Sequence, residues 1–340
     1  MGEPVEFAMQ FTVTEPVFTR AHADELIELG RMADGYGLHS IGIGDTGFRL
    51  SDAVSRTTLL ALGTTRALVG LRPTNPWTRD PQIAAAFLAT LDSMTGGRAF
   101  MEIATGDSAV RSIGRKPATR ARLTEYVACV RDLLANGRGS FQGREIRAYG
   151  GARPPVRISI GAEGPRMLEL AGEIGDAVSI GTGVTAEVVS WSLDRVARGG
   201  RGAEPWFTVR SALDDDREAA RAQVRASLAS ILHHSMRHGV EDRLVPEEFH
   251  AAIRDYVRGY TLAEHQSTGG ANERLMERLG LTGFAMQRWG LAGDAADWIE
   301  RIGELRANGI RRIWLANRGR MPQLKRMLRT FGEDVLPRVR

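Results

Sequence analysis

The sequence predicts an α/β protein, a (β/α)8 TIM barrel with a helical insertion between its seventh and eighth strands. Short apolar runs alternate with longer stretches of helical periodicity, which indicates repeated βαβ units and a parallel sheet. Eight such units account for most of the 340 residues, and a barrel of this kind needs about 250 residues before insertions. The alternative, a doubly wound sheet, is disfavoured because no GxGxxG sequence follows the first strand.

In the first half of the chain, four predicted strands each precede a predicted helix. The strands are Val5–Thr12, Ser40–Gly44, Ala67–Leu71 and Ala99–Thr105, and the helices are Arg20–Tyr36, Asp52–Gly63, Asp80–Met94 and Ala118–Asn136. Gly37 suits the end of the first helix, and Pro81 suits the first turn of the third.

The second half repeats this alternation. The strands are Val156–Gly161, Ala177–Ile180, Trp206–Arg210 and Arg312–Ala316, and the helices are Gly164–Ile174, Ala186–Arg198 and Pro322–Thr330. Residues 215–289 have a largely helical pattern and interrupt the connection between the last two strands. We therefore expect one barrel domain over residues 1–340 that contains this insertion.

Composition excludes several classes of protein. Hydrophobic residues make up 43% of the chain and charged residues 25%, as in globular proteins, and the one cysteine, Cys129, excludes an internal disulfide. No apolar run approaches the ~20 residues of a membrane span. The net charge is +4 without a Lys/Arg-rich cluster, so we expect no nucleic-acid partner. The N-terminal residues lack the features of a secretory signal, so we expect a cytoplasmic protein.

Small, polar turns follow the predicted strands at the end of a barrel where function collects. Glycine-rich turns at 105–108, 161–166 and 181–183 each lead into a helix, and glycine backbone at a helix start favours a bound anion. They are either a phosphate cradle or ordinary βα turns. The loop at 72–81 carries three prolines, and both Arg72-Pro73 and Asn75-Pro76 are candidates for a cis bond.

Four segments resemble the bacterial-luciferase-like superfamily. They are TNPWTRDP (Thr74–Pro81), TGDSAVRSIGRKPA (Thr105–Ala118), GAEGPRMLELAGEIGDAVSIGTG (Gly161–Gly183) and GLAGDAADWIERIGELRANGIRRIWL (Gly290–Leu315). They resemble most the branch of methylenetetrahydromethanopterin reductase and other deazaflavin (coenzyme F420)-dependent oxidoreductases.

The resemblance implies a cofactor at the carboxyl-terminal mouth of a (β/α)8 barrel. The cofactor ring would pack on the third-strand turn, Gly70 to Pro73, which includes Leu71 and in relatives often holds a non-prolyl cis peptide. The residues that match the ring and ribityl contacts are Asn75, Gly106, Asp107 and Ser108. Those that match the phosphate site are Gly161, Ala162, Glu163, Gly164, Gly181 and Thr182.

Two departures from the family pattern bear on the substrate. Gln10 stands near the end of the first strand, where reductases of this branch tend to carry an acid. Thr46 follows the second-strand aspartate, where a sugar-phosphate-oxidising branch carries histidine. The chain therefore resembles a relative with another small-molecule substrate. We expect Gln10, Thr46, Trp77 and Trp289 to contact it.

Asp107 and Asp45 are the predicted catalytic residues. A carboxyl group beside an apolar ring can have its pKa raised towards neutrality and then deliver a proton. The alternative is that each aspartate simply caps the following helix. Glu102 lies inside a predicted strand, where it needs a partner if it faces the barrel interior. His233, His234 and His238 lack the HExxH pattern, so we expect a solvated or lid-contacting helix face and no metal site.

These observations predict an F420-dependent oxidoreductase that transfers a hydride to or from an imine, enone or ketone. An FMN-dependent luciferase-like monooxygenase is the alternative, and a non-catalytic flavin-binding protein is a second one. We also expect a homo-oligomer, a dimer. The insertion is predicted to be either a lid over the substrate or a fixed scaffold packed on the outside of the barrel or at a dimer contact.

Overall fold

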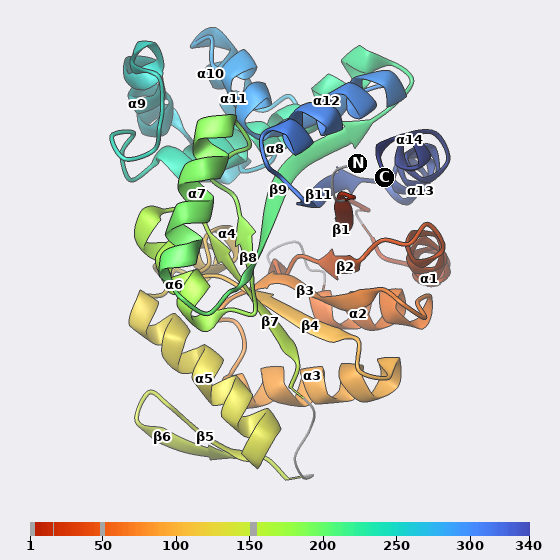
Figure 1. Cartoon of the computed structure of the whole chain (residues 1–340), viewed down its shortest axis with the longest axis vertical. Coiled ribbons are helices and arrows are strands. Elements are labelled where there is room, and N and C mark those ends of the chain that lie inside the picture. Colours follow the sequence, from red (N-terminus) through yellow and green to blue (C-terminus); the bar gives the residue numbers. More distant parts are fainter. Residues whose placement is uncertain (1–3, 16, 48–51, 150–154) are drawn as a thin grey trace.

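The computed structural model describes residues 4–15, 17–47, 52–149 and 155–340, and its centre is a closed parallel barrel (Figure 1). Within these residues, eight strands follow one another around the barrel in chain order, and β9 closes it by pairing with both β8 and β11. The strands are β1 (Glu6–Val13), β2 (Ser40–Ile43), β3 (Leu68–Thr74), β4 (Ala99–Ile103), β7 (Arg157–Ala162), β8 (Ala177–Ile180), β9 (Glu204–Leu213) and β11 (Arg312–Gly319). The predicted (β/α)8 fold is confirmed.

The helices that connect the strands, together with those that follow β11, surround the barrel (Figure 1). They are α1 (Arg20–Gly35), α2 (Ala53–Leu62), α3 (Pro81–Thr95), α4 (Ser108–Arg111), α5 (Arg120–Asn136), α6 (Pro165–Ile174), α7 (Ala186–Arg198), α12 (Ala295–Ala307), α13 (Met321–Thr330) and α14 (Leu336–Val339). Local sequence sets their ends. The side chains of Asp52 and Asp80 accept hydrogen bonds from the first-turn amides of α2 and α3, and Gly96 and Gly137 end α3 and α5 in the left-handed conformation.

Four helices lie between β9 and β11 in the region where the sequence predicts an insertion. They are α8 (Arg217–Met236), α9 (His250–Gly259), α10 (Ala271–Arg278) and α11 (Thr282–Trp289), with short 3-10 turns at Glu247–Phe249 and Leu262–Glu264. They enclose a hydrophobic cluster of their own that includes Leu228, Tyr256 and Trp289. A short strand that was not predicted, β10 (Gly290–Gly293), follows and pairs in parallel with the end of β9.

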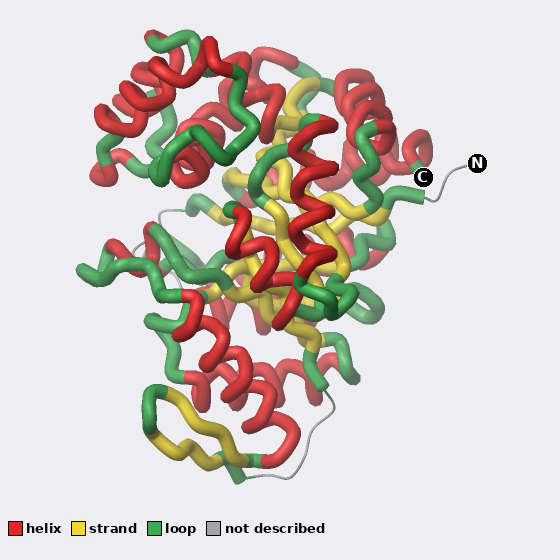
Figure 2. Tube along the Cα trace, turned by 60° about the vertical axis from the view of Figure 1, so that its left-hand side comes forward, coloured by secondary structure: helices red, strands yellow, loops and turns green. Residues whose placement is uncertain are grey.

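A second unpredicted feature is the antiparallel hairpin of β5 (Arg138–Phe141) and β6 (Arg144–Arg147), which lies outside the barrel beside α5 (Figure 2). Phe141 of this hairpin packs edge-on against Tyr126 of α5, with the ring centroids 5.5 Å apart. Cys129 lies next to it on the same helix and is 1% exposed. Burial raises the pKa of its thiol to about 11.

Across the described residues, the structure holds no helix long and apolar enough to span a membrane.

The amino-terminal end of the barrel interior is closed by aromatic side chains. The ring centroids of Trp206 and Phe100 each lie 5.9 Å from that of Trp314, and Ala8 and Ala177 complete this cluster. Phe100, Trp206 and Trp314 are at most 4% exposed, so the barrel is filled at this level. A cavity can therefore open only towards the carboxyl-terminal ends of the strands.

A buried arginine lies directly above this aromatic cluster. The guanidinium of Arg72, on β3, lies 4.0 Å from the ring centroid of Trp314, and its Nε lies 3.1 Å from a carboxylate oxygen of Glu102. Its Nη2 donates to the hydroxyls of Ser179 and Thr208, at 2.9 and 2.7 Å. Burial lowers the pKa of Arg72 to about 10, so it remains charged at neutral pH.

Replacing Glu102 by glutamine should destabilise the protein strongly. The Arg72 charge would then lose its ionic partner inside the barrel, and breaking a buried pair costs about 3–5 kcal/mol. The free energy of unfolding from denaturant titration measures this loss. Glu145→Gln, in an exposed pair with Arg147 on the hairpin, is the control and should change stability by less than about 1 kcal/mol. Equal effects of the two variants would contradict a supporting role for the Arg72–Glu102 pair.

Candidate functional site

A cavity of about 390 Å³ opens at the carboxyl-terminal ends of the barrel strands. Its wall comes from the end of β1, from the turns that follow β2–β4, β7 and β8, from β9, from Arg56 of α2, from the end of α8, and from His265 and Gln266. This is the end at which (β/α)8 barrels carry their sites. Most of the predicted site residues line it, namely Gln10, Asp45, Thr46, Asn75, Gly106, Asp107, Ser108, Gly161, Ala162, Glu163, Gly164 and Gly181.

Three predicted cofactor residues lie elsewhere. A Cβ at Gly70 would collide with the carbonyl oxygen of Phe100, so this glycine serves close strand packing, and Leu71 is 1% exposed in the hydrophobic core outside the barrel. The hydroxyl of Thr182 lies 2.8 Å from that of Ser192 and is buried. The β3 turn reaches the cavity only from Arg72 onward.

Neither predicted substrate tryptophan lines the cavity. Trp289 is 0% exposed because it belongs to the core of the insertion, and its Nε1 donates to the carbonyl of Gly181 at 2.9 Å. Trp77 is covered by a guanidinium group, with Cζ of Arg122 3.7 Å from its ring centroid. Both rings support neighbouring loops, so the prediction that they stack on a substrate is not supported by their placement.

The β3 turn contains a cis bond, which is Arg72-Pro73 and therefore precedes proline. One of the two predicted candidates is thus cis, whereas the family pattern implied a non-prolyl cis peptide. Beyond it, the side-chain oxygen of Asn75 accepts from the amides of Trp77 and Thr78, at 3.0 and 3.1 Å. This Asx turn gives the proline-rich loop a fixed shape at the cavity wall.

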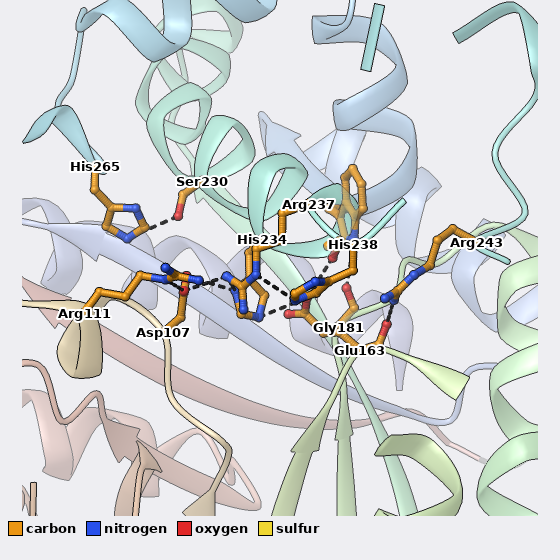
Figure 3. A network of polar contacts seen from close by, with 12 residues as sticks. Asp107, Arg111, Glu163, Gly181, Ser230, His234, Arg237, His238, Arg243 and His265 are labelled. Carbon is orange, nitrogen blue, oxygen red and sulfur yellow. Dashed lines mark hydrogen bonds and ion pairs between the residues drawn. The ribbon is translucent and has the colours of Figure 1, made fainter. Parts of the chain in front are cut away.

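Asp107 is held by two guanidinium groups and an imidazole ring (Figure 3). Its carboxylate lies 2.8 Å from Arg111 Nε, 3.0 Å from His234 Nδ1 and 2.6 Å from Arg237 Nη1. Burial alone would raise the pKa of Asp107, but the hydrogen bond and charge of His234 and the charge of Arg237 together lower it well below its usual range. The expected upward shift is therefore wrong, and Asp107 is an ionised acceptor.

His234 bridges two carboxylates that come from different strands (Figure 3). Its Nδ1 faces Asp107, after β4, and its Nε2 lies 3.3 Å from an oxygen of Glu163, after β7. The Ser235 hydroxyl donates to the same Glu163 carboxylate at 2.8 Å, and Arg243 donates to the Glu163 carbonyl. The end of α8 is thereby fastened across the cavity mouth to two barrel turns.

The three histidines that the sequence brings together have different partners. His233 stacks on Tyr260 with ring centroids 3.9 Å apart, and burial lowers its pKa to about 4. His234 contacts the two carboxylates, and His238 Nε2 lies 3.1 Å from Arg237 Nε. Within the described residues, no group of three potential ligands is arranged to hold a metal ion. Of the three histidines, His234 is the one whose ring contacts carboxylates of two barrel turns.

Asp45 is committed to the protein itself. Its carboxylate accepts from Nε and Nη2 of Arg79, at 2.9 and 3.2 Å, and from the Thr74 hydroxyl at 2.8 Å. The residue is 7% exposed. These bonds tie the β2 turn to the β3 turn, so Asp45 shapes the cavity wall.

Gln10 is also fixed, by the buried arginine. Its side-chain oxygen accepts from Arg72 Nη1 at 2.5 Å. An acid at this position would place a second carboxylate beside the one guanidinium that Glu102 already neutralises. A neutral amide at this position therefore keeps the Arg72–Glu102 pair balanced in charge. Gln10 also lines the cavity.

Sequence reasoning missed four arginines that line the cavity, Arg56, Arg210, Arg237 and Arg243, and it assigned His234 only to a solvated or lid-contacting helix face. Arg210 ends the predicted strand Trp206–Arg210, and the alternation of Trp206, Thr208 and Arg210 was the available signal that it faces the barrel interior. The end of α8 carries no comparable signal, because helical periodicity does not show which barrel turn a helix crosses.

Replacing Asp107 by asparagine should loosen the end of α8. His234 and Arg237 would lose their charged partner, and a hydrogen bond to a charged group contributes about 1.5–3 kcal/mol. Amide hydrogen exchange over residues 230–240 should therefore become about tenfold faster or more. Asp45→Asn is the matched control because its partners lie outside α8, and it should leave this segment unchanged. Identical exchange in wild type and Asp107→Asn would show that other contacts hold α8.

Comparison with known proteins agrees with this architecture. The luciferase-like monooxygenase family model matches residues 6–312. The chain is 29% identical over 306 residues to the 5,10-methylenetetrahydromethanopterin reductase of Archaeoglobus fulgidus, which covers 84% of this chain and 87% of the relative. It is 28% identical over 342 residues to the F420-dependent glucose-6-phosphate dehydrogenase of Nakamurella multipartita, covering 93% and 92%. The F420-dependent tetrahydromethanopterin reductase structure from Methanopyrus kandleri matches with a TM-score of 0.73 at 18% identity, over 100% of both chains. The resemblance seen in the sequence is thus confirmed, and the chain belongs to the luciferase-like monooxygenase family.

Proposed function

We propose that this protein is a coenzyme F420-dependent oxidoreductase that transfers a hydride to or from a small organic substrate of the imine, enone or ketone type. The observation that carries the proposal is a cavity at the barrel mouth that is rich in basic side chains. Relatives that match nearly the whole of this chain include enzymes named for this coenzyme. An anionic cofactor is attracted to such a mouth.

The residues at the ends of β3, β4, β7 and β8 suit this cofactor. The backbone of Gly164 opens α6 and faces Arg243, whose Nη2 would lie 3.2 Å from a Cβ at this position. Glycine backbone, a helix start and a guanidinium group together favour a phosphate. Gly161, Ala162, Gly164 and Gly181 would hold the phosphate, while Asn75, Gly106 and Ser108 would contact the ring and ribityl chain.

Coenzyme F420 supplies or accepts a hydride when bound. The protein must therefore bind and orient the cofactor and the substrate, and hold or move a proton. We place this proton at Nε2 of His234, the nitrogen that faces Glu163 at 3.3 Å. Asp107, ionised and bonded to Nδ1, fixes the orientation of the ring. Asp107 is then a positioning residue, and the acid–base role first assigned to it passes to the histidine.

Cofactor binding tests the proposal directly. Oxidised F420 and FMN, each titrated into the purified protein, should give tight binding of F420 and weaker binding of FMN. Gly164→Asp should abolish F420 binding because the new carboxylate repels the phosphate and lies against the Arg243 guanidinium, whose charge it would neutralise. Gly303→Asp, at an open position on α12, is the control. Tighter binding of FMN would favour the monooxygenase alternative, and no binding of F420 would refute the proposal.

The proton role of His234 has its own test. Imines, enones and ketones are screened with reduced F420, and kcat is then measured across pH on the best substrate. His234→Gln should lower kcat by about 10²–10⁴-fold with little change in cofactor affinity, the usual size of a general acid–base effect. His250→Gln, elsewhere in the insertion, is the control. A His234→Gln enzyme with unchanged kcat and pH profile would exclude this histidine from proton transfer.

A further inference from the structure

Five arginines line the cavity, and the side chains of three of them donate hydrogen bonds to other protein groups. Arg72 is bonded to Gln10, Ser179 and Thr208, Arg237 is bonded to Asp107, and Arg243 donates to backbone carbonyl oxygen. Arg56 and Arg210 differ. Among the residues that the structure describes, neither side chain makes a hydrogen bond or an ion pair.

We infer that the substrate carries a carboxylate or phosphate group and that Arg210, assisted by Arg56, binds this group inside the cavity. The inference rests on the proposed function, which it extends by naming the class of substrate. A guanidinium presents several N–H donors in a planar fork that matches such an anion.

The position of Arg210 places its charge one layer above the buried polar pair. It lies two residues after Thr208 on β9, so both side chains point to the barrel interior, and Thr208 is bonded to Arg72. The charges of Glu163 and Glu102 act on Arg210. Glu102, however, is paired with Arg72, and Glu163 contacts His234 and Ser235. The donors of Arg210 are thus left for a ligand.

Arg56 supplies a second positive charge from the neighbouring wall. It lies on α2, is 8% exposed, and its Cζ lies 4.6 Å from the ring centroid of Phe18. This cation–π contact uses the face of the Phe18 ring and leaves the N–H groups of the guanidinium for another partner. Among the described residues no carboxylate forms an ion pair with Arg56, and Glu15 acts on it only through its charge, so this buried cation gains from a bound anion.

The two arginines lie in the half of the barrel that the cofactor does not need. Around the barrel, β9, β11, β1 and β2 are consecutive. Arg210 lies on β9 and Gln10 on β1, and Arg56 lies on α2, the helix that follows β2. The residues proposed for the cofactor all follow β3, β4, β7 and β8. Because β9 adjoins β8, an anion at Arg210 would lie beside the proposed cofactor site, on the side of the cavity that the proposed cofactor residues leave open, within reach of hydride transfer.

The test uses matched pairs of anionic and neutral probes. Phenylpyruvate and phenylacetone, benzoate and benzamide, and phenyl phosphate and phenol are titrated calorimetrically into the protein, with and without saturating F420. We expect at least one anion to bind about tenfold or more tightly than its neutral counterpart. Arg210→Gln should remove this preference, Arg210→Lys should keep part of it, and Arg56→Gln should weaken it.

F420 affinity and melting temperature are measured on the same variants, which separates the possible failures. Unchanged F420 affinity in Arg210→Gln with loss of the anion preference supports the inference. Loss of F420 affinity in Arg210→Gln would assign Arg210 to the cofactor and overturn it, as would a wild-type protein that prefers none of the anions. If wild type binds no F420 but retains an Arg210-dependent anion preference, the proposed function fails while the anion site stands.

Discussion

The charge of Arg72 is the constraint on which the barrel interior depends. A guanidinium that burial cannot deprotonate at neutral pH must be neutralised and hydrogen-bonded where it lies. Its partners come from β1, β4, β8 and β9, and it rests on an aromatic ring from β11. One side chain thereby connects opposite walls of the barrel. It also forms the floor of the cavity, because everything below it is closed by aromatic rings.

Above this floor, the carboxylates of the cavity already have partners within the protein. Asp45 and Asp107 are fully engaged with protein cations, and Glu163 is engaged with the end of α8. Two of the cavity arginines, Arg56 and Arg210, form no ion pair among the described residues, so the cavity as a whole is suited to a ligand with negative charge. The insertion contributes to this balance, because α8 brings His234 and Arg237 to turns more than a hundred residues away in sequence.

The sequence predicted the fold well because its signal is local and repeated. Each barrel strand is a short apolar run before a polar turn, and topology alone places those turns together, so most of the turn residues proposed for the site do line the cavity. β10 escaped prediction because Gly-Leu-Ala-Gly has no strand signature. Trp289 and the pKa of Asp107 were misjudged for one reason: both depend on contacts with or within the insertion, and helical periodicity does not specify those contacts.

The burial of Cys129 has a practical consequence for measurements in solution. With its pKa raised to about 11 and its side chain enclosed between α5 and the hairpin, the one native thiol hardly reacts at neutral pH. The wild-type chain therefore serves as its own cysteine-free background. A cysteine introduced on the exposed face of α9 or α10 would accept a fluorescent or spin label at that position alone, without a prior substitution that disturbs the core.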